Sequence, residues 1–146
     1  MRTLLALLSL AAPLAAAPVP KALKKTPASL DGNWRWESQE KNGKVSQASP
    51  SDYCLWKVAG DTMTLVTEKG TMKDEPCGFA SATNADGVRT FEYRVNSNGY
   101  HRRGVCELDG DTLRVAYTAD NNVPPKAVKG EDGVTVYTFR RVTDSK

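Results

Sequence analysis

The sequence contains few of the residues on which most catalytic and metal sites depend. His101 is the single histidine of the 146-residue chain, and the three cysteines, Cys54, Cys77 and Cys106, form no Cys-x-x-Cys pair. A zinc site normally needs such closely spaced ligands. No Gly-x-Ser-x-Gly motif and no phosphate-binding loop occurs in the chain. The sequence therefore predicts no enzyme activity, no metal and no cofactor.

The remaining candidates for acid–base chemistry fall where turns are expected. His101 stands in an expected turn, and the carboxylates there or at a strand entry are Asp31, Asp61, Asp109 and Asp111. Aspartate is common in turns because its side chain accepts hydrogen bonds from nearby backbone N–H groups. We interpret these five residues as turn residues.

The chain carries little net charge. The formal net charge is +3, and the basic pairs Lys24-Lys25, Arg102-Arg103 and Arg140-Arg141 are short and separated. A nucleic-acid-binding domain usually carries a concentrated basic surface. The sequence therefore predicts no nucleic-acid partner.

The longest apolar stretch, 4–14, is too short to span a bilayer. It follows Arg2 and precedes Ala15-Ala16-Ala17, an order typical of a cleaved export signal. Cleavage after Ala17 or Ala16 fits the small residues there. We expect a signal peptide over 1–17, a periplasmic or secreted protein, and no stable membrane span after cleavage.

The chain after the expected signal divides into a linker and one domain. Residues 18–29 include three prolines and several lysines, a composition typical of a flexible linker. The domain is expected over 30–146. In an oxidising compartment, its three cysteines predict one disulfide with one thiol left over, or none. If a bridge forms, we favour Cys54 with Cys77, because both lie at the entrance to a predicted strand and the chain between them is short. Cys106 is then a small buried apolar residue.

Two nearly identical segments predict the architecture. Val58–Val66 and Leu108–Ala116 each place a Gly-Asp pair, Gly60-Asp61 or Gly110-Asp111, between runs that alternate apolar and polar residues. Such a pattern is typical of a tight hairpin, since glycine tolerates a positive φ. Similar turn signals divide the chain into eight predicted strands: 32–38, 53–58, 62–67, 77–83, 88–95, 102–108, 112–118 and 134–142. We predict an all-β, antiparallel up-and-down barrel, whose closure removes exposed strand edges.

Alternation also predicts which side chains face the barrel interior. The predicted inward residues are Trp34, Trp36, Trp56, Val58, Met63, Leu65, Phe79, Phe91, Tyr93, Val95, Leu108, Leu113, Val115, Tyr117, Tyr137 and Phe139. An eight-stranded barrel is wide enough either to be filled by side chains or to hold one small ligand. Both alternatives stay open for the candidate lining residues Trp36, Trp56, Phe91, Tyr93 and Tyr117.

The predicted barrel resembles a known group of proteins at two motifs. Gly32-Asn-Trp34 is similar to the Gly-x-Trp start of lipocalin-like barrels, in which the tryptophan closes one end against an arginine of the last strand; here Arg140 or Arg141 takes that place. The segment 104–117 resembles the core motif of an uncharacterised lipocalin-like domain family of small exported bacterial proteins, numerous in planctomycetes.

Two departures from that family are visible. Its pattern has an aromatic residue at the place of Cys106 and an Arg-Pro pair at the place of Pro124-Pro125. The resemblance implies a lipocalin-like fold and export, and it carries over no catalytic or binding residue. It is compatible with a domain that binds a small apolar ligand. The alternative is a protein-interaction module of the cell envelope, such as a protease inhibitor or scaffold, that uses 18–29 as an arm.

Overall fold

The structure, a computed structural model, describes residues 28–49, 54–67, 75–95, 99–118, 123–131 and 133–143. Within these ranges the regular secondary structure consists of strands. They are β1 (Gly32–Lys41), β2 (Lys44–Gln47), β3 (Cys54–Ala59), β4 (Thr62–Thr67), β5 (Glu75–Thr83), β6 (Arg89–Val95), β7 (His101–Asp109), β8 (Thr112–Thr118) and β9 (Val134–Val142).

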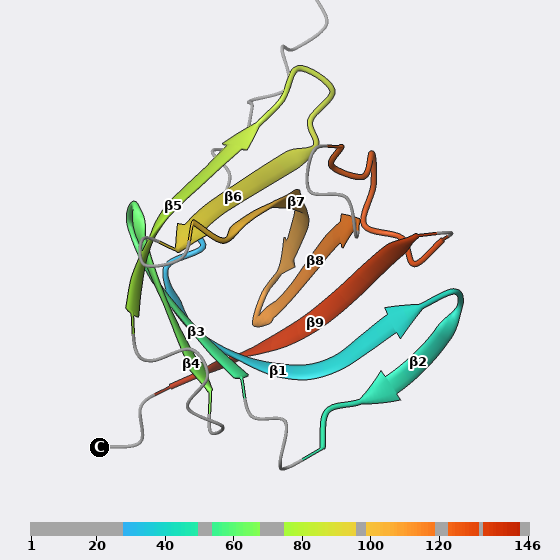
Figure 1. The fold of residues 1–146 in the computed structure, drawn as a ribbon, viewed down its shortest axis with the longest axis horizontal. Coiled ribbons are helices and arrows are strands. Elements are labelled where there is room, and N and C mark those ends of the chain that lie inside the picture. The colour runs from blue at the N-terminus through green and yellow to red at the C-terminus, as the bar shows by residue number, and fades with distance from the viewer. Residues whose placement is uncertain are drawn as a thin grey trace, which may run out of the picture.

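Eight of these strands close into a barrel. All neighbours pair antiparallel in the order β1-β3-β4-β5-β6-β7-β8-β9, and β9 pairs back onto β1. Figure 1 shows β1 and β9 side by side along the lower part of the view. This confirms the predicted all-β, antiparallel, eight-stranded barrel, which is consistent with a lipocalin-like barrel. Among the described residues, no helix is long and apolar enough to cross a membrane.

A ninth strand, β2, was not predicted. Residues 44–47 lie between the predicted strands 32–38 and 53–58, but they pair with the second half of β1. Asn42 and Gly43, at the turn between β1 and β2, have φ angles of 50° and 70°, as a type I′ hairpin requires. The Asn-Gly pair was the available signal. It was missed because all four side chains of β2 are exposed and show no apolar alternation.

The two Gly-Asp pairs form the tight turns that the sequence predicts. Gly60 and Gly110 have φ angles of 60° and 55° and join β3 to β4 and β7 to β8. Asp31, just before β1, holds the first of these turns, because its Oδ1 accepts a hydrogen bond from the backbone N–H of Gly60 at 2.8 Å. Hydrogen bonds from Ser29 and from Gly60 lower the pKa of this carboxyl. Asp31 therefore has a structural role at the start of the barrel.

The barrel interior is a continuous hydrophobic core. Every residue predicted to face inward belongs to this core or packs against it, and Leu30, Cys54, Cys77, Tyr100 and Cys106 join them. Trp34 and Met63 are completely buried. The period of two along each strand thus predicted the correct face on every strand that was assigned.

A second, smaller core lies on the outside of the barrel. Val105, Ala116 and Val136 come from β7, β8 and β9, and Val128 comes from the segment 123–131 that follows β8. Each is less than 9 % exposed. These strand residues alternate with inward residues, so they point outward, where the segment 123–131 covers them. This layer was not predicted, because one face of each strand was expected to be exposed to solvent.

Of the two alternatives left open for the cysteines, the structure shows the one without a disulfide: all three are free, and the favoured pair of Cys54 and Cys77 is not bridged. Cys54 pairs with Thr67 and Cys77 pairs with Met63, on opposite sides of β4. Two strand spacings of about 4.8 Å already exceed the roughly 7 Å limit between the Cα atoms of a disulfide. The predicted up-and-down order, with the strand 62–67 between 53–58 and 77–83, already placed one strand between these two cysteines.

We expect three free thiols when the protein is unfolded in guanidinium without reductant and titrated with a thiol reagent. In the folded protein, burial raises the pKa of Cys54 and of Cys106 to about 11. At pH 7.5 roughly one such thiol in three thousand is then a thiolate, the reactive form. Both should react slowly when folded, and faster as the pH rises toward 11. A count of one thiol would contradict the pairing register.

The expected signal peptide, 1–17, and residues 18–27 of the expected linker lie outside the described residues. The same holds for residue 53, the expected first residue of the second strand, which the structure begins at Cys54. These expectations remain predictions.

Candidate functional site

One end of the barrel is closed by Trp34. Its indole Nε1 donates a hydrogen bond to the backbone oxygen of Leu30 at 2.8 Å, and the guanidinium carbon of Arg141 lies 4.1 Å from the centre of its ring. Arg141 Nη1 also donates to the backbone oxygen of Asp31 at 2.6 Å. A side chain at Gly32 would collide with this guanidinium, so the glycine makes room for it.

Of the two arginines named from the sequence, Arg141 therefore contacts Trp34. Arg140 points to the outer face, where its Nε lies 3.4 Å from Glu37 Oε1 and its Nη1 donates to Thr112 Oγ1 at 3.1 Å. Successive residues of a strand face opposite sides, so only one of the pair can reach the barrel interior.

The middle of the barrel is filled by aromatic rings. The ring centre of Trp56 lies 4.5 Å from that of Phe139, 6.0 Å from Phe91 and 5.8 Å from Tyr93. All four residues are at most 5 % exposed. Three candidate lining residues, Trp56, Phe91 and Tyr93, thus belong to the packed core, as expected for a filled interior.

The other two candidates, Trp36 and Tyr117, lie further from Trp34 at what we call the tyrosine end. This end consists of Trp36, Tyr100, Arg102, Tyr117 and Tyr137, all of which are half-buried. The rings form a chain of contacts: Trp36 lies 5.8 Å from Tyr137, and Tyr137 stacks on Tyr117 at 5.1 Å. Their partial exposure distinguishes them from the core below. A ligand that reaches this end would meet aromatic surface.

Arg102 brings a positive charge into this aromatic group. Its guanidinium carbon lies 4.6 Å from the ring centre of Tyr117 and 5.1 Å from that of Tyr100, and its Nε donates a hydrogen bond to the Tyr100 hydroxyl. Burial opposes its charged form, but the neighbouring tyrosines, Tyr100 first, raise its pKa above the ordinary value. In the sequence Arg102 is part of the basic pair Arg102-Arg103, and it was not predicted to face inward. The available signal was that it shares the face of Leu108, which alternation places inward.

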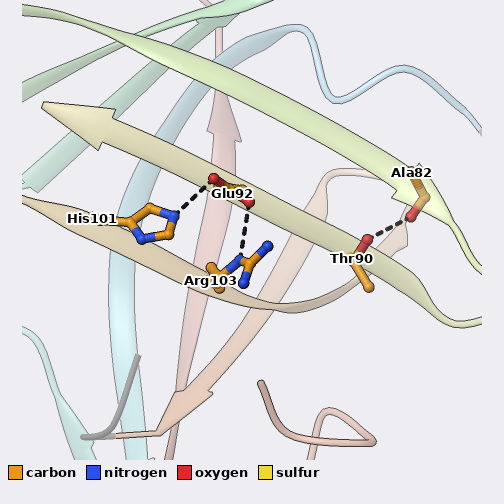
Figure 2. Close-up of polar contacts among 5 residues, drawn as sticks. All are labelled: Ala82, Thr90, Glu92, His101 and Arg103. Carbon is orange, nitrogen blue, oxygen red and sulfur yellow. Dashed lines mark hydrogen bonds and ion pairs between the residues drawn. The ribbon is translucent and has the colours of Figure 1, made fainter. Parts of the chain in front are cut away.

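A separate polar cluster lies on the outer face of β6 and β7. Figure 2 shows Glu92 between His101 and Arg103: His101 Nε2 lies 2.8 Å from Glu92 Oε1, and Arg103 Nε lies 3.0 Å from Oε2. Burial opposes ionisation of Glu92, yet Arg103 and His101 together lower its pKa. His101 was expected in a turn, and it is instead the first residue of β7. The cluster joins two strands through partly exposed polar contacts, which contribute little to stability.

The structure also contains a groove of about 960 Å³ beside the turn that joins β5 to β6. Val88, Leu108 and Val128 contribute apolar surface to it, and Arg89 and Lys126 contribute positive charge. Arg89 is already engaged, because its Nη1 donates to the backbone oxygen of Ala28 at 2.6 Å. None of the residues that line this groove belongs to the tyrosine end, so a ligand-binding experiment must separate the two.

Among the residues that the structure describes, no three side chains of His, Cys, Asp or Glu are grouped so that they could hold a metal ion.

Comparisons with protein-family models, curated proteins and solved structures each found no match to this chain. The interpretation of the tyrosine end therefore depends on its own residues and geometry.

Proposed function

We propose that this protein is an exported, non-enzymatic, lipocalin-like domain that binds a small apolar ligand at the tyrosine end of its barrel. The supporting observation is the half-buried group of Trp36, Tyr117 and Tyr137, which lies above a fully packed core. Ligand sites are usually concave and lined by apolar and aromatic side chains with a few polar groups. Because the rings around Trp56 fill the middle of the barrel, we expect the ligand at the end of the barrel and expect it to be small.

The three tryptophans provide a direct test, because each indole N–H gives its own signal in a nitrogen–proton correlation spectrum. We expect a neutral naphthylamine probe, N-phenyl-1-naphthylamine, to shift the Trp36 signal. Trp34 should not respond, because its N–H is buried and bonded to Leu30 at the other end. A titration in which no tryptophan signal moves would contradict the proposal and favour the protein-interaction alternative.

Substitutions then assign the site. Trp36→Leu and Tyr117→Leu should each weaken binding of the probe by about two- to tenfold, since loss of one well-placed aromatic contact is worth about 0.5–1.5 kcal/mol. Val88→Thr, in the groove beside the β5–β6 turn, is the matched control and should leave binding unchanged. Thermal unfolding of every variant shows whether the barrel is intact. If Val88→Thr weakens binding of the probe and Trp36→Leu does not, the groove is the binding site.

A further inference from the structure

We infer that the ligand of the tyrosine end is an organic anion with a small apolar or aromatic body, and that Arg102 binds its charged group. This inference rests on the proposed function. It adds the chemical class of the ligand and names the residue that selects it.

Arg102 points toward the barrel interior, among the aromatic rings of the tyrosine end. Arg102 and Gly104 alternate with His101 and Arg103 along β7, so Arg102 faces inward while His101 and Arg103 contact Glu92 outside. An aromatic site intended only for neutral apolar ligands gains nothing from a partly desolvated guanidinium. The same group provides planar, charged donors that match a carboxylate, sulfonate or phosphate.

Two of the phenols near Arg102, those of Tyr93 and Tyr117, stay uncharged. Tyr117 and Tyr100 hold the guanidinium through their rings and the Tyr100 hydroxyl. Burial raises the pKa of Tyr93 and of Tyr117 well above the usual range, so neither becomes a phenolate that would neutralise Arg102. The rings orient the cation and at the same time offer apolar faces to the body of a ligand.

A matched pair of probes tests this directly. 1-Anilinonaphthalene-8-sulfonate has the ring system of N-phenyl-1-naphthylamine with one added sulfonate. We expect the purified protein to bind the sulfonate at least tenfold more tightly than the neutral probe, measured by fluorescence titration at fixed ionic strength. In Arg102→Met this preference should fall to about twofold or less, while binding of the neutral probe stays within about threefold.

Three controls make the outcome specific. Arg94→Met removes an exposed arginine of β6 and should keep the preference for the sulfonate. Lys126→Met tests the groove beside the β5–β6 turn: if it removes the preference and Arg102→Met does not, the inference is wrong. Arg102→Lys keeps the charge without the planar donors, and it should retain only part of the preference.

The outcomes separate the two proposals. If neither probe binds, the proposed ligand site itself is wrong. If the neutral probe binds and the sulfonate binds no better, only the inference about Arg102 is wrong. Should Arg102→Met fail to fold, the Nε–H signal of Arg102 in the unchanged protein decides: a shift with the sulfonate but not with the neutral probe supports the inference, and no shift overturns it.

Discussion

Replacement of Trp34 by alanine is expected to lower the free energy of unfolding by about 3–5 kcal/mol, the range for removal of a buried tryptophan. Trp34 is 0 % exposed, and it lies between Leu30, whose backbone oxygen it binds, and the guanidinium of Arg141. Alanine would leave a cavity at the closed end and remove the hydrogen bond that fixes the chain entering β1. Chemical denaturation followed by tryptophan fluorescence of the remaining residues measures the loss.

Two further variants locate the origin of that loss. Arg141→Met keeps much of the apolar stem but removes the charge over the indole, which is worth about 0.5–2 kcal/mol. Val45→Ala, on the outer strand β2, changes a side chain that is 63 % exposed and should alter stability by less than about 0.5 kcal/mol. If Trp34→Ala costs no more than Val45→Ala, Trp34 does not close the barrel.

Gly104→Ala is expected to destabilise the barrel at the upper end of the range of about 1–3 kcal/mol for overpacking. A Cβ atom at Gly104 would lie 2.7 Å from Cε1 of Phe91 and would collide with the backbone oxygen of Ala116. The ring of Phe91 is already fixed between Trp56 and Tyr93, so it cannot move freely. The backbone oxygen belongs to the β7–β8 pairing and cannot move alone.

Gly78 in β5 is the matched control for this prediction. It is also a strand glycine, but nothing lies within 4 Å of its Cβ position. Gly78→Ala should be neutral or stabilise the protein by about 0.4–1 kcal/mol, because alanine restricts the unfolded chain more than glycine does. In the double variant Gly104→Ala/Phe91→Leu, part of the loss should be recovered. Equal effects of Gly104→Ala and Gly78→Ala would contradict the close approach.

Much of the fold could be predicted because it depends on local patterns. Gly60-Asp61 and Gly110-Asp111 predicted two hairpins, and alternation placed the inward side chains correctly. The strand β2 was not predicted, because its exposed side chains show no alternation. The outer core around Val128 was not predicted either. That core forms only because the segment 123–131 folds back onto β7, β8 and β9, a long-range contact that no local pattern contains.

The candidate site was predictable only in part. Trp36, Trp56, Phe91, Tyr93 and Tyr117 were recognised as inward aromatic residues, but the sequence could not show which of them fill the core. The position of each residue along the barrel axis decides whether it fills the core, and this position follows from the stagger of the strands. Arg102 was overlooked because an arginine next to Arg103 resembles solvated surface charge, although Arg102 shares the face of Leu108, which alternation along 102–108 places inward.

The sequence by itself determined the class of this fold, the faces of its strands and the scarcity of catalytic groups, since these follow from turn chemistry and a period of two. Only the tertiary structure decided two other features. It placed Arg141 rather than Arg140 against Trp34, and it placed Arg102 among the tyrosines. Each depends on strand register and barrel closure, which bring together residues far apart in the chain.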